Sequence, residues 1–264
     1  AKRRVIWCFA AVRRQCATMT TTESEQQLWK RTYESSLAVV PPEEGPAWCA
    51  MQAVRLQLRD AGLYRWPPHA NLVYPFCPVE DMGVAARTLR VACAEIEPFN
   101  VELGSFGVFG GKSRGVLWLE PDPNGKAKLV DLQARLADAL GFRNNKVFVP
   151  HFTVSHYGSA AEAEDAMKTT EWTSVSFPVD SVNLMARHGD GQFELQYRIH
   201  LGPSAGDDQE ELPRRLRGMP LEPFEWTQAA RDQMNQRRRK KGRRRRPRPT
   251  SGGSTEEEPP TLVD

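Results

Sequence analysis

Two short segments of the same design constrain this chain more than any other feature. PPHANLVYPF (67–76) and VPHFTVSHYG (149–158) each place a histidine directly after a proline and continue as alternating apolar sequence. Strand side chains alternate, so His69 and Asn71 share one face of the first segment, as His151 and Thr153 do in the second. The two histidines are 82 residues apart. This echo predicts two similar halves, each contributing one histidine strand.

Strand and helix patterns alternate around these two segments. Strands are expected at 35–42, 69–76, 99–110, 114–121, 151–158, 175–188 and 191–202, the last two as a hairpin, and helices at 47–61, 79–97, 126–141 and 160–169. Such an order predicts an α+β domain with two similar halves.

Composition and the limits of the periodic apolar patterns divide the chain into three parts. Residues 36–203 carry the regular patterns and are predicted as the domain, and hydrophobic residues, at 40% of the chain, suffice for a core. Residues 1–35 read as a partly disordered leader, and 204–264 as a linker followed by a basic, low-complexity tail. No run reaches the roughly 18 apolar residues of a membrane span, so no membrane association is expected.

Charge is distributed unevenly along these three parts. Lys and Arg minus Asp and Glu gives +4 for residues 1–35, −4 for 36–203 and +3 for 204–264. Affinity of the domain for a polyanion must therefore come from a local pocket and not from a general field.

Both ends of the chain admit more than one interpretation. Residues 1–18 resemble a transit peptide, or are a remnant upstream of Met19. The basic run 237–248 can serve as a nuclear import signal, a nonspecific nucleic-acid tether or a solvated tail. The tether residues would be Arg237, Arg238, Arg239, Lys240, Lys241, Arg243, Arg244, Arg245 and Arg246. An intracellular location in nucleus or cytoplasm is expected, or an organelle if the transit peptide is genuine.

The five cysteines include no CxxC pair and no zinc-type spacing. Cys8, Cys16, Cys49, Cys77 and Cys93 are therefore predicted to be free thiols, with no metal site and no cofactor.

The paired histidines suit proton transfer at a phosphodiester. One imidazole can remove a proton from the attacking hydroxyl or water while the other delivers a proton to the leaving oxygen, because histidine titrates near neutral pH. The Asn71 amide and the Thr153 hydroxyl supply hydrogen bonds to the nonbridging oxygens without adding negative charge. A lone histidine before an apolar strand is usually structural, but the matched pair favours a functional role.

These motifs resemble those of the 2H phosphoesterase superfamily, which includes the 2′-5′ RNA ligase-like and 2′,3′-cyclic phosphodiesterase proteins. PHFTV (150–154) fits its His-x-Thr/Ser pattern, whereas PHANL (68–72) has Asn71 in place of Thr or Ser. The resemblance spans about residues 36–202. It implies a bilobed α+β fold around a central cleft, no metal, His69 as proton donor and His151 as proton acceptor.

Several further residues are weighed against ordinary structural roles. Tyr157 could stack on a base and Arg114 could contact substrate, although charges in the turn that holds Lys112 and Arg114 are usually solvated. Strand alternation predicts that His156 points away from the His151 face, and that Tyr74 and Phe76 are core residues. His188 and His200 are expected to be non-catalytic.

The leading hypothesis is a metal-independent phosphodiesterase, expected to be a monomer, that acts on an RNA or nucleotide 2′,3′-cyclic phosphate or 2′-5′ bond, with ligation as its reverse. The alternative is an RNA- or nucleotide-binding module with the same fold and little or no turnover, motivated by Asn71. A purely structural domain is the third interpretation.

Overall fold

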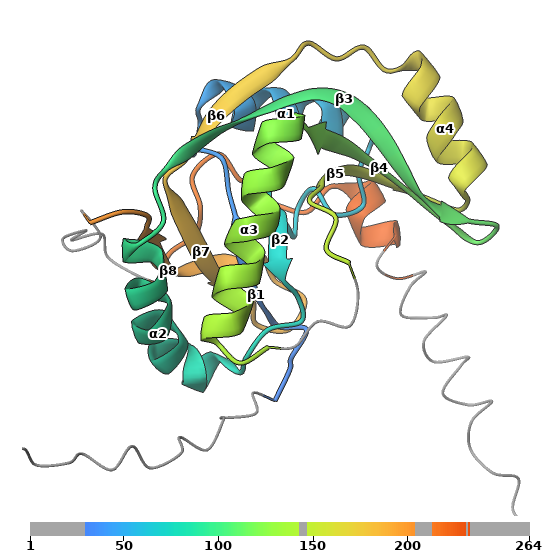
Figure 1. Ribbon diagram of the computed structural model, residues 1–264. Helices are drawn as coiled ribbons and strands as arrows, with labels where there is room; N and C mark the ends of the chain where they lie inside the picture. The colour runs from blue at the N-terminus through green and yellow to red at the C-terminus, as the bar shows by residue number, and fades with distance from the viewer. Residues whose placement is uncertain (1–29, 143–146, 204–212, 231, 233–264) are drawn as a thin grey trace, which may run out of the picture.

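A computed structural model describes residues 30–142, 147–203, 213–230 and 232 (Figure 1). The leader up to residue 29, with Cys8 and Cys16, and the basic run 237–248 lie outside these described residues. Cys49, Cys77 and Cys93 are free, as predicted. No helix within the described ranges is long and apolar enough to cross a membrane.

The domain consists of two four-stranded antiparallel sheets with helices packed around them, which confirms the predicted α+β class. One sheet has the order β2-β1-β7-β8 and the other β5-β4-β3-β6. The strands are β1 (Ser35–Val39), β2 (Ala70–Val73), β3 (Phe99–Gly111), β4 (Arg114–Pro121), β5 (Phe152–Tyr157), β6 (Val175–Val179), β7 (Ser181–Ala186) and β8 (Glu194–His200). Each histidine motif therefore opens an edge strand, β2 in one sheet and β5 in the other.

The chain crosses between the sheets at Asp180. The sequence predicts one strand over 175–188, but β6 pairs with β3 in one sheet while β7 pairs with β1 and β8 in the other. That single-strand prediction is wrong because the run breaks at Asp180, which belongs to neither strand, so its two parts join different sheets. The β7–β8 hairpin is formed as expected.

The helices lie close to their predicted positions and are α1 (Pro46–Gln57), α2 (Met82–Ala94), preceded by a 3₁₀ turn at Val79–Asp81, α3 (Pro123–Ala139) and α4 (Ala160–Thr169). Helix α3 starts earlier than predicted because Asp122 caps it, accepting hydrogen bonds from the backbone N–H groups of Asn124 and Gly125, with Pro123 as its first residue. Figure 1 shows α2 and α3 side by side against the sheets and α4 beside the β3–β4 hairpin. Their apolar faces enclose one large core with both sheets.

Both motif strands contain an irregularity at the same place. In β2, Asn71 pairs with Ala38 and Val73 with Leu37, so Leu72 is the extra residue. In β5, Thr153 pairs with Trp118 and Ser155 with Leu117, so Val154 is the extra residue. A bulge of this kind reverses the alternation of side chains beyond it. The side chains of residues after Leu72 and Val154 therefore face the side opposite to the one that strict strand alternation predicts.

Part of the stretch predicted as linker and tail packs on the first sheet. Leu216 and Met219 are buried beside Trp48, and Arg214 pairs with Leu195 of β8 through an isolated bridge. The anchor is Glu43, whose side chain is only 3% exposed. Its carboxylate accepts hydrogen bonds from Arg198 Nη2 (2.6 Å), Arg214 Nη2 (2.7 Å) and the Arg217 backbone N–H (2.5 Å). Two isolated apolar residues leave no periodic pattern in the sequence, so the attachment could not be predicted.

This anchor predicts a stability effect that depends on pH. Burial raises the pKa of Glu43, but the hydrogen bonds from Arg214, Arg217 and Arg198 outweigh it and lower the pKa from 4.5 to about 2. The carboxylate therefore contributes stability above about pH 4.5, and this contribution is lost as the pH falls towards 2. Glu43→Gln should cost about 2–3 kcal/mol near pH 7 and almost nothing at pH 2, measured by urea unfolding. The exposed Glu97→Gln is the control, and a constant difference across this range would contradict the account.

Candidate active site

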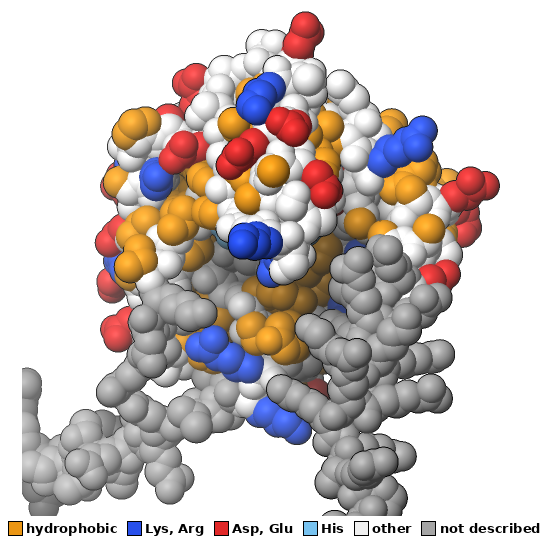
Figure 2. All heavy atoms as spheres, turned by 90° about the vertical axis from the view of Figure 1, so that its right-hand side faces the viewer, with side chains coloured by type: hydrophobic (Ala, Val, Ile, Leu, Met, Phe, Trp, Pro, Cys, Tyr) orange, Lys and Arg blue, Asp and Glu red, His pale blue; other side chains and the backbone are white. Residues whose placement is uncertain are grey.

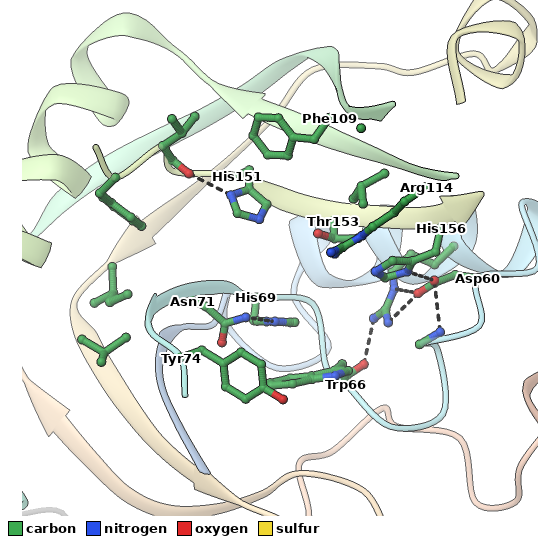
Figure 3. Close-up of a pocket in the computed structure, with 18 of the residues that line it drawn as sticks. Asp60, Trp66, His69, Asn71, Tyr74, Phe109, Arg114, His151, Thr153 and His156 are labelled. Atoms are coloured by element: carbon green, nitrogen blue, oxygen red, sulfur yellow. Dashed lines mark hydrogen bonds and ion pairs between the residues drawn. The ribbon is translucent and has the colours of Figure 1, made fainter. Parts of the chain in front are cut away.

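A cavity of about 740 Å³ lies between the two sheets and brings both histidine motifs together. His69, Asn71, His151 and Thr153 all line it, and Figure 3 shows the two imidazoles on facing walls. Figure 2 shows a hollowed face of the described part, with Lys and Arg side chains around the hollow. Each sheet therefore supplies one of the two motif histidines to the same water-accessible cavity.

The two histidines are oriented by the same backbone contact. His69 Nδ1 lies 2.7 Å from the carbonyl oxygen of Pro67, and His151 Nδ1 lies 2.8 Å from that of Val149. A carbonyl only accepts, so both Nδ1 atoms carry hydrogen and both Nε2 atoms are the reactive nitrogens. In each case a proline separates the histidine from the residue whose carbonyl accepts this hydrogen bond, which explains the shared Pro-His sequence.

Asn71 forms a direct hydrogen bond to the histidine of its own motif, His69. The Ser36 hydroxyl donates to Asn71 Oδ1 (2.5 Å), so the amide nitrogen points to His69 Nε2 at 2.9 Å and donates to it. The amide thus favours the neutral form of His69, with Nε2 as an acceptor. The Ser36–Asn71 pair joins the neighbouring strands β1 and β2.

Aromatic rings hold both imidazoles in place. Trp66 stacks on His69 with ring centroids 4.5 Å apart and planes 13° apart, while Phe109 and Trp118 meet His151 at steep angles. A stacked indole face attracts the protonated form of an imidazole. Trp66 therefore offsets part of the cost of protonating His69.

Burial dominates the titration of both histidines. It lowers the pKa of His69 from 6.5 to about 3, with the charges of Arg55 and His151 acting in the same direction and the Pro67 hydrogen bond against them. Burial also lowers the pKa of His151, and the neighbouring His156 adds to this shift. Both rings are therefore neutral at pH 7.

Two residues line the cavity although the sequence predicted that their side chains would point elsewhere. His156 and Tyr74 each follow the motif histidine of their strand by five residues, and both lie beyond its bulge. The predictions that they point away from the cavity or into the core are wrong because the bulges reverse their direction. Phe76 is fully buried, as predicted.

Of the two predicted substrate contacts, one lines the cavity and the other does not. Arg114 lines the cavity, whereas Tyr157 packs against the core and does not. His188 and His200 are also absent from the cavity lining, and His188 is exposed. Residues that sequence reasoning missed include Arg55, Asp60 and Trp66, which come from α1 and the loop after it.

Comparison with known proteins agrees with the motifs. A model of the 2′-5′ RNA ligase superfamily matches residues 41–191. No curated protein matches this sequence. Similar solved structures include a phosphoesterase (18% identity, 66% of this chain and 99% of that chain, TM-score 0.43). E. coli LigT complexed with 3′-AMP is similar at 17% identity, over 64% of this chain and 98% of that chain, with a TM-score of 0.42. Kluyveromyces marxianus Usb1 is similar at 11% identity, over 65% of this chain and 99% of that chain, with a TM-score of 0.41.

The family match confirms the resemblance predicted from the Pro-His strands, and it supports a phosphodiesterase-type function at the level of the superfamily. The chain belongs to the 2′-5′ RNA ligase superfamily of 2H phosphoesterases.

Proposed function

We propose that the chain is a metal-independent phosphodiesterase that opens a 2′,3′-cyclic phosphate, or cleaves a related 2′-5′ bond, in RNA or a nucleotide. One observation carries the proposal. His69 and His151 come from different sheets, line one cavity, and have their Nδ1 atoms tied to backbone carbonyls, which leaves two Nε2 atoms for chemistry. Two imidazoles are sufficient for an acid–base pair.

The proposed reaction needs one proton acceptor and one proton donor. His151 Nε2 removes a proton from water as its oxygen bonds to phosphorus, while His69 Nε2–H delivers a proton to the leaving ribose oxygen as the P–O bond breaks. When phosphate enters, the Asn71 amide exchanges its bond to His69 Nε2 for one to a phosphate oxygen, and the Thr153 hydroxyl donates to another. The anion then raises the pKa of His69 and favours the protonated ring.

The charges of the cavity favour an anionic substrate even though residues 36–203 are net negative. Arg31, Arg55 and Arg114 line the cavity, and Asp60 is its one carboxylate among the described residues. Asp60 is already paired with Arg55 at 2.9 Å. A local positive field of this kind attracts a phosphodiester in the manner expected from the sequence.

The activity is tested by incubating the protein with an oligonucleotide that ends in a 2′,3′-cyclic phosphate, in excess chelator. We expect conversion to a single terminal phosphomonoester, resolved as the 2′ or 3′ isomer by chromatography. Loss of turnover in chelator, restored by a divalent metal, would contradict a metal-independent reaction.

The alternative is a binding module, and the bond from Asn71 to His69 Nε2 favours it because it occupies the reactive nitrogen. In that case RNA should bind tightly in a salt-sensitive manner and no product should form. Deletion of residues 237–248 should then remove most of the affinity. Rapid turnover of the cyclic phosphate excludes this alternative.

The lowered pKa values predict an unusual pH profile. The reaction needs one neutral and one protonated histidine, and the free protein meets this condition mainly below pH 6.5 because both pKa values are lowered. We expect kcat/KM to be greatest below pH 6.5 and to fall as the pH rises. The kcat profile should lie at higher pH because bound phosphate raises the pKa of both rings. A kcat/KM optimum above pH 7.5 would disagree with these shifts.

Asn71 should contribute as a phosphate donor. Asn71→Ala removes the amide and should lower kcat about 10²-fold, the usual effect of losing one transition-state donor. Asn71→Thr supplies a hydroxyl like that of Thr153 and should keep most of the rate of the unaltered protein. Steady-state kinetics on the cyclic-phosphate substrate measure both variants. Equal rates for Asn71→Ala and the unaltered protein would remove this residue from the site.

A further inference from the structure

The third histidine of the cavity, His156, is held in one orientation by a buried carboxylate. Its Nδ1 donates to Asp60 Oδ1 at 3.0 Å, while its side chain remains 42% exposed (Figure 3). Because the hydrogen bond uses Nδ1, the remaining nitrogen, Nε2, is available to a ligand in the cavity. In the doubly protonated ring this Nε2–H is a hydrogen-bond donor to an anionic oxygen.

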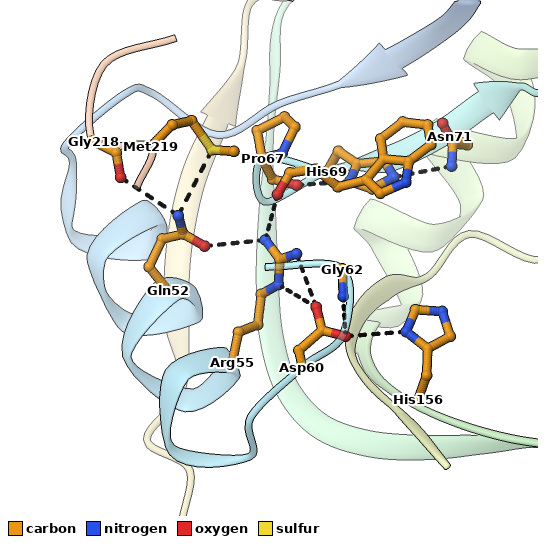
Figure 4. Close-up of polar contacts among 11 residues, drawn as sticks. Gln52, Arg55, Asp60, Gly62, Pro67, His69, Asn71, His156, Gly218 and Met219 are labelled. Carbon is orange, nitrogen blue, oxygen red and sulfur yellow. Dashed lines mark hydrogen bonds and ion pairs between the residues drawn. The ribbon is translucent and has the colours of Figure 1, made fainter. Parts of the chain in front are cut away.

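Asp60 is itself fixed and neutralised from the other side (Figure 4). Arg55 donates through Nε and Nη2 to Asp60 Oδ2 at 3.0 and 2.9 Å, and the Gly62 backbone donates to Oδ1 at 3.1 Å. The Arg55 and Asp60 side chains are only 3% and 1% exposed. The carboxylate is therefore shielded and orients His156 without presenting free negative charge to the cavity.

Arg114 supplies a positive group on the same wall as His156. Strands β4 and β5 are neighbours, Val116 pairs with His156, and Arg114 lies two residues before Val116, so the side chains of Arg114 and His156 share a face. Figure 3 shows both lining the cavity on the side of Asp60. Within the described ranges Arg114 forms no ion pair with any carboxylate. A guanidinium in this position is ready to bind a phosphate through two N–H groups.

We propose that Arg114 and His156 form a second phosphate site, so that the preferred substrate carries another phosphate next to the one held by His69 and His151. This inference rests on the proposed function for the first phosphate. In an oligonucleotide that ends in a cyclic phosphate, the second group is the diester on the 5′ side of the terminal nucleoside. The cavity, at about 740 Å³, has room for a nucleotide with both groups. The substrate class is thus the end of an RNA strand and not a free cyclic mononucleotide.

Two substrates that differ only in the second phosphate test this site. They are a nucleoside 2′,3′-cyclic phosphate and the same compound with a 5′-phosphate. The unaltered protein should have a kcat/KM about tenfold higher for the 5′-phosphorylated compound, the scale of one charge-assisted hydrogen bond. Arg114→Ala and His156→Ala should bring this ratio close to one, and Arg114→Lys should restore part of it.

Lys112→Ala is the matched control, because Lys112 lies in the turn next to Arg114 but does not line the cavity. It removes the same charge and should keep the ratio. A ratio near one in the unaltered protein, or an equal fall in Lys112→Ala and Arg114→Ala, would overturn the second site. The first result points to no site at all, and the second to a general charge effect.

Binding separates this site from the catalytic proposal. Calorimetry should show that a nucleoside 3′,5′-bisphosphate binds about tenfold more tightly than the 3′-monophosphate, and that Arg114→Ala removes the difference. If neither cyclic compound is turned over but this difference is present, the second site stands and the proposed reaction fails. If turnover occurs and both ratios are near one, the reaction stands and the second site fails.

Discussion

Replacing His151 with alanine should lower kcat for the cyclic-phosphate substrate by about 10²–10⁴-fold, the range expected for loss of a general acid or base. The Nε2 of His151 is the proposed acceptor for the proton of the attacking water, and no other imidazole is held in its position. His69→Ala should lower kcat by a similar factor, since the leaving oxygen then departs without a proton. The double variant should be little worse than either single variant, because the two groups act in one concerted step.

The fold must be shown to survive these substitutions. His188→Ala is the matched control, because His188 is exposed and lies outside the cavity lining, and it should retain the full rate. Far-ultraviolet circular dichroism and thermal melting should be similar for all variants. Equal rates for His151→Ala and His188→Ala would remove His151 from the reaction.

Replacing Asp60 with alanine should destabilise the protein by about 3–5 kcal/mol, the usual cost of breaking a buried ion pair from one side. Burial raises the pKa of Asp60, but the charge of Arg55 and the hydrogen bond from His156 outweigh it, so the pKa is lowered and the group is ionised at pH 7. Asp60→Ala leaves the Arg55 guanidinium buried without its counter-charge. Urea unfolding at pH 7 measures the loss.

Asp190→Ala provides the comparison for this effect. Asp190 forms a surface pair with Arg65 at 3.6 Å and is 59% exposed, so its loss should cost no more than about 1 kcal/mol. Adding Arg55→Met to Asp60→Leu should recover much of the stability, because an apolar pair replaces both buried charges. Similar losses for Asp60→Ala and Asp190→Ala would contradict the buried role of this pair.

The order of strand and helix patterns was enough to predict the fold class, and the resemblance carried by the two Pro-His motifs implied a cleft shared by the two histidines. The directions of His156 and Tyr74 did not follow from strict strand alternation, because β2 has a bulge at Leu72 and β5 has one at Val154. The sequence did contain one indication that the two residues are equivalent, since both follow their motif histidine by five positions.

Other parts of the site depend on contacts that sequence patterns do not carry. Asp60 acquires its role from His156, 96 residues away, and Arg55 reads in the sequence only as a polar position on a helix. The Glu43 anchor depends in the same way on Arg214 and Arg217. Long-range pairing of charged groups is set by the packing of the sheets, which local propensity does not specify.

A crystal structure with a bound nucleoside 2′-phosphate tests the central claim most directly. We expect one phosphate between the two imidazoles, with His69 Nε2 and His151 Nε2 each within hydrogen-bond distance of a different oxygen. Asn71 and Thr153 should donate to the remaining oxygens. A phosphate bound outside this cavity, or one that contacts a single histidine while the other ring stays distant, would contradict it.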